Sequence, residues 1–427
     1  MKVTIIGLGY VGLVTAVGLS ELGHQVFGCD TDPQKIASLK KGQVPFYEPG
    51  LDKLLKKNFK SGRLVFTANL AEIINQAPII FICVGTPAAK SGQADLSYVE
   101  SALKTIAQTA KTGKIIVIKS TVPVGTSEKF EKLLNPHGQK FPFISCSEFL
   151  REGLGVNDFF QPDRIIVGAT RRALALKVLN LFAKIKTIKF ITNRETAELI
   201  KYTANSFLAM KISFINEIAN LCEKVGADVM DVAWGIGLDK RINPLWLKAG
   251  IGYGGSCFPK DVWALRRIAE NAGYDFKILK SVIEVNQRQS ELFIKKIQGH
   301  FGQLNGLTIG VLGLAFKNDT DDIRDSVALR AIEQLVSLGV KVKAYDPLAM
   351  PNAKKFFAPK ITLCHSAGEV FKNSRAVVIA TEWPQFKNLP WQKFGRSLKE
   401  RVIFDGKNLL DPATMEKLKF KYYSIGR

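Results

Sequence analysis

The stretch that decides the fold is Val3-Thr4-Ile5-Ile6-Gly7-Leu8-Gly9-Tyr10-Val11-Gly12. Its first four residues predict a buried strand, and the three glycines predict a tight turn that opens a helix. In such a turn Gly7 permits the bend, Gly9 admits a pyrophosphate, and Gly12 lets the helix pack closely on the sheet. The stretch therefore predicts a dinucleotide-binding α/β domain.

An acidic residue at the end of the next strand supports this prediction. Asp30 lies 23 residues after Gly7 and follows the apolar segment 26–29. A carboxylate there hydrogen-bonds a ribose 2′-hydroxyl and repels a 2′-phosphate, so NAD is favoured over NADP. Lys35 has two interpretations. Its side chain either lies near the adenosine end of the dinucleotide or is a solvated charge on a helix.

Short apolar strands alternate with amphipathic stretches through residues 1–193, which predicts a doubly wound parallel sheet. The predicted strands are Val3–Ile6, Val26–Cys29, Ile79–Val84, Ile115–Ile118, Phe143–Ser145 and Arg164–Val167. From Arg194 to Val225 there is no Gly or Pro, and apolar residues recur at helical spacing, which predicts one long helix. Further helices are expected up to about residue 300.

The first pattern returns near residue 301. Strand-like segments begin at Leu307, Val340, Ala376 and Val402, and the glycine turn at Gly310 and Gly313 lacks the full fingerprint. We therefore expect two Rossmann-like doubly wound domains joined by a long central helix and a helical middle region. The expected domains are residues 1–193 for NAD, 194–300 for dimerisation and the catalytic cysteine loop, and 301–427 for a ligand other than the dinucleotide.

The composition narrows the function classes. The 427 residues are 46% hydrophobic and carry a net charge of +22. Basic residues are scattered over helices and are not concentrated in a tail, which favours an anionic small molecule over nucleic acid. No apolar run approaches a membrane span. The first strand begins almost at Met1, which leaves no room for a signal peptide and predicts a cytoplasmic protein.

Several polar segments are expected at the carboxyl edge of the first sheet, where ligands of this fold bind. Thr86 follows the third predicted strand, Thr121 follows the next, and Glu148 and Glu152 follow the fifth. Each of these segments could also be ordinary loop or helix surface. Lys201 and Asn205 are four residues apart on the long helix, so they share one face, which points either to solvent or into a cleft.

Cys257 is the cysteine with an unusual neighbourhood, Gly252-Tyr253-Gly254-Gly255-Ser256-Cys257-Phe258-Pro259-Lys260-Asp261. Six cysteines in a chain this long do not form a disulfide framework, and no cysteine and histidine spacing predicts a metal site. Lys260 and a helix expected to begin near Asp261 would favour a thiolate. We therefore interpret Cys257 as a nucleophile, in preference to a packed cysteine in a glycine turn.

These motifs together resemble the UDP-glucose 6-dehydrogenases of the nucleotide-sugar dehydrogenase family. The resemblance rests on segments 7–12, 119–126, 148–153 and 254–261, in that order, and extends over essentially the whole chain. It implies oxidation of UDP-glucose to UDP-glucuronate with two NAD⁺ and one water. Cys257 would hold the sugar as a thiohemiacetal and then as a thioester.

The resemblance also implies roles for individual residues. Lys201 and Asp261 would transfer the first proton and stabilise oxyanions, with Asn205 and a water assisting. Glu152 would assist thioester hydrolysis, and Thr121 would hold a catalytic water. The cofactor would be bound by Gly7, Gly9, Val11, Gly12, Asp30, Lys35, Thr86, Thr121, Glu152, Lys260 and Arg324.

The UDP-sugar would be bound by residues of several segments, and Arg241 would reach into the partner subunit's site, which implies a homodimer. The expected substrate residues are Glu148, Phe149, Leu150, Arg151, Glu152, Lys201, Asn205, Arg241, Trp246, Leu247, Lys248, Ala249, Gly250, Gly254, Phe316, Lys317 and Lys407. Lys407 stands where many relatives have an arginine. A lysine ammonium is a point charge and cannot make the bidentate contact of a guanidinium, so the choice of sugar stays open.

Three alternatives remain open from the sequence. The first is a sibling enzyme that oxidises GDP-mannose or UDP-N-acetylmannosamine. The second is a two-electron β-hydroxyacid dehydrogenase, which would need neither Cys257 nor a nucleotide-binding third domain. The third is a nucleic-acid-binding protein, which the charge alone would allow and which would be indifferent to NAD.

Overall fold

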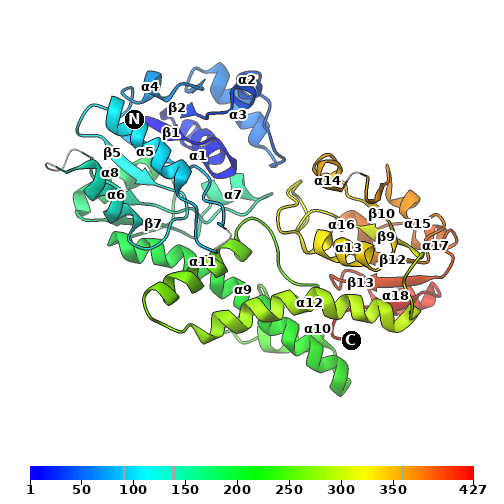
Figure 1. The fold of residues 1–427 in the computed structure, drawn as a ribbon. Helices are drawn as coiled ribbons and strands as arrows, with labels where there is room; N and C mark the ends of the chain where they lie inside the picture. The colour runs from blue at the N-terminus through cyan, green and yellow to red at the C-terminus, as the bar shows by residue number, and fades with distance from the viewer. Residues whose placement is uncertain (90–91, 137–140, 358) are drawn as a thin grey trace. The chain divides into compact units, whose positions relative to one another are not determined.

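The computed structural model describes residues 1–89, 92–136, 141–357 and 359–427, and they form two compact units. The first unit comprises residues 1–204 with 267–273, and the second comprises residues 205–266 with 274–427. Figure 1 shows a sheet in each unit. The long helices α9 and α12 follow the strands of the first sheet in the sequence and precede those of the second. No helix in the described ranges is long and apolar enough to span a bilayer.

The sheet of the first unit has the strand order β3-β2-β1-β4-β5-β6-β7-β8. Its strands are β1 (Lys2–Ile6), β2 (Gln25–Cys29), β3 (Leu64–Thr67), β4 (Ile79–Ile82), β5 (Ile115–Ile118), β6 (Phe143–Ser145), β7 (Arg164–Ala169) and β8 (Ile188–Thr192). Its helices are α1 (Tyr10–Glu21), α2 (Pro33–Lys40), α3 (Leu51–Lys60), α4 (Leu70–Ile73), α5 (Ser97–Thr109), α6 (Thr126–Leu134), α7 (Gly155–Phe160) and α8 (Arg172–Leu179).

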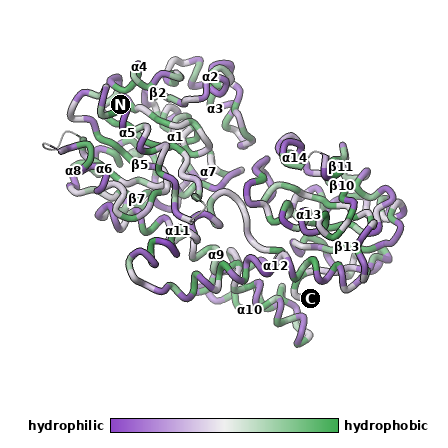
Figure 2. Tube along the Cα trace, in the orientation of Figure 1, coloured by the Kyte–Doolittle hydropathy of each residue, from purple (hydrophilic) through white to green (hydrophobic). Residues whose placement is uncertain are grey.

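Both faces of this sheet are buried, as a doubly wound fold requires. Ile79 and Phe81 of β4 belong to one hydrophobic core, while Ile80 and Ile82 belong to the core on the opposite face. Successive side chains of a strand point to opposite faces, so continuous apolar strands such as β5 serve two helical layers. The hydrophobic colour of β5 in Figure 2 marks this pattern.

One strand pair of the first sheet departs from the predicted parallel arrangement. Strands β6 and β7 pair antiparallel, with Ile144 opposite Ala169. An antiparallel pair needs no crossover helix that returns the chain in the same direction, so the short α7 suffices as the connection. The sheet also contains two edge strands, β3 and β8, that are not among the predicted strands.

The long helix α9 runs from Arg194 to Val225, as the sequence predicts. It is followed by α10 (Val229–Gly237), α11 (Phe258–Asn271) and α12 (Lys277–Phe301). The helix α11 begins three residues earlier than expected, because Pro259 at its second position needs no backbone hydrogen bond there. This start places Cys257 directly before the helix.

The sheet of the second unit is parallel, with strand order β11-β10-β9-β12-β13-β14. Its strands are β9 (Thr308–Leu312), β10 (Lys341–Tyr345), β11 (Thr362–Leu363), β12 (Ala376–Ile379), β13 (Val402–Asp405) and β14 (Lys421–Tyr423). Its helices are α13 (Val327–Ser337), α14 (Met350–Phe357), α15 (Ala367–Phe371), α16 (Pro384–Lys387), α17 (Trp391–Gly395) and α18 (Pro412–Lys417). The order reverses between β9 and β12, as it does between β1 and β4, so both units have Rossmann-like topology.

Candidate functional site

The glycine turn after β1 has the geometry of a pyrophosphate cradle. Gly7 has φ +88°, and a Cβ at Gly12 would lie 1.8 Å from the carbonyl oxygen of Gly7. A Cβ at Gly9 would meet no atom within 4 Å, so the turn is open at this residue. Gly9 also caps α1 without a side-chain hydrogen bond. The first backbone N–H groups of α1 thus remain available to an anion, which fits NAD.

The predicted ribose-binding carboxylate is in place at the end of β2. Asp30 Oδ2 accepts from Leu8 N at 2.8 Å, which ties Asp30 to the glycine turn. Lys35 Nζ lies 2.8 Å from the same oxygen, so Lys35 is paired with Asp30 and is not a freely solvated charge. The pair lies beside the turn, where the adenosine end of a dinucleotide binds.

The loops after β4 and β5 are joined to each other at the carboxyl edge of the sheet. Thr86 Oγ1 donates to the carbonyl oxygen of Thr121 at 2.8 Å, and Ser120 Oγ donates to the carbonyl oxygen of Val84 at 2.6 Å. Thr86 is buried, so its hydroxyl fixes the loop that carries Thr121. The sequence prediction that these two segments meet is confirmed.

Lys201 meets the segment after β6 within the first unit. Its Nζ lies 3.1 Å from Glu148 Oε1, and both side chains are nearly inaccessible to solvent. The same ammonium lies 5.2 Å from the ring centroid of Phe149, whose other cationic neighbour is Arg164 at 4.0 Å. Lys201 therefore does not face solvent, and it brings a positive charge to the carboxylates of the expected substrate loop.

Asn205 and Asp261 meet in the second unit. Asn205 Nδ2 donates to Asp261 Oδ2 at 2.6 Å, and Lys260 Nζ lies 2.5 Å from Asp261 Oδ1. Asp261 is 1% exposed and Asn205 is 7% exposed. The buried carboxylate is thus oriented by an amide and balanced by an ammonium, an arrangement in which Asp261 can exchange a proton with a bound alcohol.

Cys257 is an exposed thiol beside this group. It directly precedes Phe258, the first residue of α11, and Asp261 N donates to its carbonyl oxygen at 2.9 Å. A helix N-terminus favours a negative sulfur, because the backbone N–H groups there carry partial positive charge. The other five cysteines are buried and unpaired.

The glycines before Cys257 allow close packing on the segment between β9 and α13. A Cβ at Gly254 would lie 2.2 Å from the carbonyl oxygen of Asp325, and one at Gly255 would lie 2.7 Å from the Phe316 ring. Phe316 therefore packs against the cysteine loop. Lys317 Nζ lies 6.0 Å from the centroid of the same ring.

The loop 246–250 packs on the turn after β13. Ile251 N donates to the carbonyl oxygen of Gly406 at 2.9 Å, and a Cβ at Gly250 would lie 2.9 Å from that oxygen. The Trp246 ring packs against Phe258 at 5.4 Å between centroids. Leu247 and Ala249 are buried, so they would offer a ligand backbone groups and not side chains.

Lys407 is held by a carboxylate that the sequence analysis did not single out. Its Nζ lies 3.2 Å from Oε2 of the partly buried Glu382. Burial alone would raise the pKa of Glu382, but the ammonium groups of Lys407 and Lys248 outweigh it and lower that pKa overall. Glu382 follows β12 at the carboxyl edge of its sheet, where ligands bind. Thr86 of the first unit was identified by the same kind of position after a strand.

Two predicted arginines each form an ion pair with a nearby aspartate. Arg324 pairs with Asp322 at 2.5 Å and lines a pocket with a volume of about 630 Å³. Arg241 pairs with Asp239 at 2.6 Å, and its side chain is 89% exposed. The predicted catalytic residues thus fall into two sets, with Thr121, Glu152 and Lys201 in the first unit and Asn205, Cys257 and Asp261 in the second.

Comparison with known proteins finds relatives that match this chain over its whole length. UDP-glucose 6-dehydrogenase TuaD of Bacillus subtilis is 45% identical over 429 residues, covering 100% of this chain and 93% of that protein. UDP-glucose 6-dehydrogenase of Rickettsia conorii is 44% identical over 429 residues, covering 100% of this chain and 99% of that protein.

Solved structures agree on the fold. A UDP-glucose dehydrogenase of Pyrobaculum islandicum has a TM-score of 0.93 and 37% identity, covering 99% of this chain and 96% of that chain. A UDP-D-ManNAc dehydrogenase of Pyrococcus horikoshii has a TM-score of 0.89 and 29% identity, covering 100% and 99%.

Family models match along the chain in order. They describe the NAD binding domain over residues 1–186, the central domain over residues 195–288 and the UDP binding domain over residues 310–412. The chain belongs to the UDP-glucose/GDP-mannose dehydrogenase family.

Proposed function

We propose that the protein oxidises the C6 alcohol of UDP-glucose to the carboxylate of UDP-glucuronate, with two NAD⁺ and one water consumed. The observation that carries the proposal is Cys257, an exposed thiol at the start of α11 beside the buried Asn205–Asp261–Lys260 group. The relatives that are 43–45% identical over the whole chain are named UDP-glucose 6-dehydrogenases.

The first oxidation removes a hydride from C6 and a proton from its hydroxyl. NAD, when bound, supplies the hydride acceptor for each of the two oxidations. Asp261 takes the hydroxyl proton, and Asn205 holds its carboxylate in one orientation. Lys201 stabilises the developing negative oxygen with an ammonium that is kept out of bulk water.

The sulfur of Cys257 then adds to the C6 aldehyde, and the aldehyde oxygen takes up a proton. The resulting thiohemiacetal keeps the aldehyde bound between the two oxidations. Loss of a second hydride from C6 and of the hydroxyl proton gives a thioester. The two oxidations together remove four electrons from C6.

Water completes the reaction by attacking the thioester carbon. The carbon–sulfur bond breaks, the sulfur leaves as the Cys257 thiolate, and Glu152 accepts a proton from the attacking water. Thr121 holds this water from the loop that Thr86 fixes. The products are the carboxylate and the free enzyme.

Several segments of the chain would bind the UDP-sugar in this proposal. Segment 148–152 binds the glucosyl group, the loop 246–250 and Gly254 bind the nucleotide, and Phe316, Lys317 and Lys407 bind the UDP portion. The buried Glu382 keeps Lys407 oriented, so the lysine acts as a fixed point charge for a phosphate oxygen or a sugar hydroxyl.

The stoichiometry of NADH tests the proposal. A limiting amount of UDP-glucose should give two NADH per molecule consumed, measured by absorbance, and UDP-glucuronate as the product by chromatography. One NADH per UDP-glucose would support a two-electron dehydrogenase instead. Turnover rates with GDP-mannose and UDP-N-acetylmannosamine test which sugar is the substrate. Faster turnover of either one than of UDP-glucose would overturn the substrate assignment.

Replacement of the nucleophile tests the covalent mechanism. Cys257→Ser should lower the rate of UDP-glucuronate formation by about a thousandfold or more, because serine lacks the thiolate that traps the aldehyde. UDP-glucose binding, measured by calorimetry, should stay within a few fold of the unmodified enzyme. Acid formation at an unchanged rate would exclude Cys257 as the nucleophile.

We propose further that the protein is a homodimer joined through α9 and α10. Phe207, Phe214 and Leu221 are spaced by seven residues on α9, and each is more than half exposed. Trp234 and Leu238 of α10 are exposed by 64% and 65%. A second copy would cover this apolar surface and bring Arg241 to its partner's substrate.

Light scattering after size exclusion tests the assembly. The unmodified chain should have twice the chain mass, and Phe214→Asp should be monomeric, since an unpaired charge in an apolar interface is costly. Tyr274→Asp changes a similarly exposed aromatic residue outside α9 and α10, so it is the matched control and should stay dimeric. A monomeric unmodified protein at micromolar concentration would contradict the proposal.

The remaining proposals concern location and boundaries. We propose a cytoplasmic enzyme, because Cys29, Cys83, Cys146, Cys222 and Cys364 are buried free thiols, which is typical of a reducing compartment. We propose functional domains over residues 1–193, 194–300 and 301–427, which limited proteolysis would test by cleavage near residues 193 and 300.

A further inference from the structure

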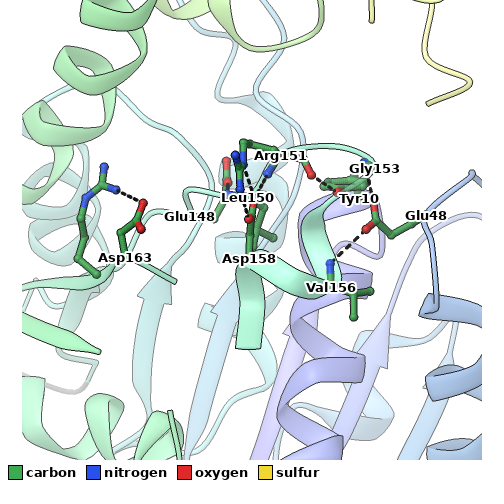
Figure 3. Close-up of polar contacts among 10 residues, drawn as sticks. Tyr10, Glu48, Glu148, Leu150, Arg151, Gly153, Val156, Asp158 and Asp163 are labelled. Carbon is green, nitrogen blue, oxygen red and sulfur yellow. Dashed lines mark hydrogen bonds and ion pairs between the residues drawn. The ribbon is translucent and has the colours of Figure 1, made fainter. Parts of the chain in front are cut away.

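The loop that carries Glu148 and Glu152 is fixed by two buried carboxylates on other segments of the first unit. The loop follows β6 and leads into α7. Figure 3 shows Glu48 beside Gly153 and Val156, and Asp158 beside Arg151. Neither Glu48 nor Asp158 has a part in the mechanism derived above, although each is less than 10% exposed.

Glu48 holds the part of the loop after Glu152. Its Oε2 accepts from Gly153 N at 2.8 Å, and its Oε1 accepts from Val156 N at 3.1 Å. Glu48 lies in the segment between α2 and α3, far from the loop in sequence. A buried carboxylate with two backbone donors binds them more strongly than a neutral acceptor would, so it fixes this turn of backbone.

Asp158 holds the residue before Glu152. Its Oδ2 accepts from Arg151 N and from Arg151 Nε, both at 2.9 Å, and its Oδ1 accepts from Arg151 Nη2 at 2.6 Å. Arg151 and Gly153 are thus each anchored by a carboxylate. Glu152 is the single residue between the two anchors, so they limit the backbone positions from which its side chain can act.

Tyr10 connects this anchor to the cofactor turn. Its hydroxyl donates to Glu48 Oε2 at 2.7 Å and lies 2.9 Å from the carbonyl oxygen of Arg151. Tyr10 is the first residue of α1, directly after Gly9 of the glycine turn. A Cβ at Gly155 would lie 2.2 Å from the Tyr10 hydroxyl, so a glycine is required where the loop passes it.

The chemistry of Tyr10 suits a permanent donor. Burial and the neighbouring carboxylates, first Glu48 and then Glu152 and Glu148, raise the pKa of Tyr10 far above its usual range. Its ring packs against Phe46 with centroids 5.2 Å apart, which fixes the direction of the hydroxyl. The hydroxyl therefore remains protonated and pointed at Glu48 across the working pH range.

We infer that Tyr10 and Glu48 are positioning residues for the hydrolytic step: they fix the backbone on either side of Glu152, the residue that takes a proton from the attacking water. The inference rests on the proposed function. In this step the water oxygen adds to the acyl carbon, the carbon–sulfur bond breaks, the sulfur leaves as thiolate, and the water proton passes to Glu152. The same contacts tie the loop to the turn that binds the cofactor.

Tyr10→Phe is the sharpest variant, because it keeps the ring and removes only the hydroxyl. Both hydride removals precede hydrolysis, so a stopped-flow trace of the variant should show a burst of two NADH per site, followed by slow turnover. The ratio of burst rate to steady-state rate should rise about tenfold over the unmodified enzyme, since small misplacements of a catalytic group cost one to two orders of magnitude. Glu48→Gln should show the same change.

Two measurements separate positioning from other effects. The kcat/KM for UDP-glucose should stay within about twofold, because the variants slow only a step that follows both hydride removals, so that kcat and KM fall together. Glu131→Gln is the matched control: Glu131 is a buried carboxylate of the same unit that pairs with Arg194 and lies outside the loop. It should lower the melting temperature without raising the burst ratio.

Each other result overturns the inference. A raised KM for NAD with an unchanged burst ratio would mean that Tyr10 serves only the cofactor. An unchanged ratio with less folded protein would mean a structural role only. Failure of the proposed function is distinguishable, because the unmodified enzyme itself would then yield fewer than two NADH per UDP-glucose.

Discussion

At the scale of the single residue, Cys257 differs from the other cysteines in its exposure to solvent and in its position before a helix. Burial raises the pKa of Cys29 to about 11 and that of Cys83 to about 12, so both thiols stay protonated at neutral pH. Burial likewise raises the pKa values of Cys146 and Cys364. Cys257 is exposed and stands at a helix N-terminus.

This contrast predicts selective alkylation. Iodoacetamide at about pH 8 should label one cysteine per folded chain rapidly, because only an accessible thiolate reacts well. Peptide mapping by mass spectrometry should place the label on Cys257, and Cys257→Ser should remain unlabelled over the same time. Comparable labelling of Cys29 or Cys83 in the folded protein would contradict the structure.

Glu382 is the residue that the sequence analysis missed, because only folding brings β12 and β13 together at one edge. Its lowered pKa means that its ion pairing with Lys407 stabilises the fold fully above its ordinary pKa of 4.5. That contribution is lost as the pH falls through the lowered folded-state value. Glu382→Gln should destabilise the protein by about 3 kcal/mol between roughly pH 6 and 8, and by less below about pH 4.5.

Urea unfolding of the unmodified protein and of Glu382→Gln across this pH range checks the sign. The variant should also raise the KM for UDP-glucose with little change in kcat, since Lys407 would lose its fixed orientation. A difference in stability that grows on acidification would show that Glu382 is not held in its ionised form by the lysines.

At the scale of the element, the start of α9 is joined to the start of α6. Glu198 accepts from Gly125 N at 2.7 Å, and from Ser127 N and Ser127 Oγ at 3.0 and 2.6 Å. Glu198 is 1% exposed. A carboxylate on one helix thus satisfies the free N–H groups at the N-terminus of another and fixes the segment after Thr121.

Loss of this cap should be measurable. Glu198→Ala leaves three buried donors without an acceptor and should lower the free energy of unfolding by about 3 kcal/mol. Glu195→Ala, on the same turn of α9 and partly exposed, is the control and should change it by less than about 0.5 kcal/mol. Differential scanning calorimetry checks both, and equal effects would contradict the capping role.

The sequence predicts some elements better than others for physical reasons. The bounds of α9 follow from its long run of helix-forming residues without Gly or Pro. The edge strands β3 and β8 are short, and Val65, Ile188 and Phe190 on them are exposed, so neither strand has the continuous apolar pattern of a central strand. The antiparallel pairing of β6 and β7 depends on tertiary contacts that periodicity does not encode.

At the scale of the whole molecule, one topology serves two kinds of ligand. Asp346 of the second unit corresponds to Asp30 in position, at the end of the second strand of its sheet. It is fully buried and accepts from Leu314 N, Ala315 N and Trp383 Nε1 through one oxygen, and from Leu348 N and Ala349 N through the other. It has no capacity left for a ribose hydroxyl, which explains why the second unit does not repeat dinucleotide binding.

The glycine fingerprint and the cysteine loop let the sequence predict both units and most of the candidate site residues. The network of Tyr10, Glu48 and Asp158 was outside that prediction, because its members are separated by up to 148 residues and meet only in the folded chain. The distinctive claim of the proposed reaction is the acyl group on Cys257.

Acid quenching during turnover tests that claim most directly. The protein would be mixed with NAD and UDP-glucose, quenched in acid, digested and mapped by mass spectrometry, with Glu152→Ala used to slow hydrolysis. The account predicts a UDP-glucuronyl thioester on the peptide that contains Cys257, at higher occupancy in the variant, and none in Cys257→Ser. Formation of two NADH per UDP-glucose with no adduct on Cys257 in either protein would contradict it.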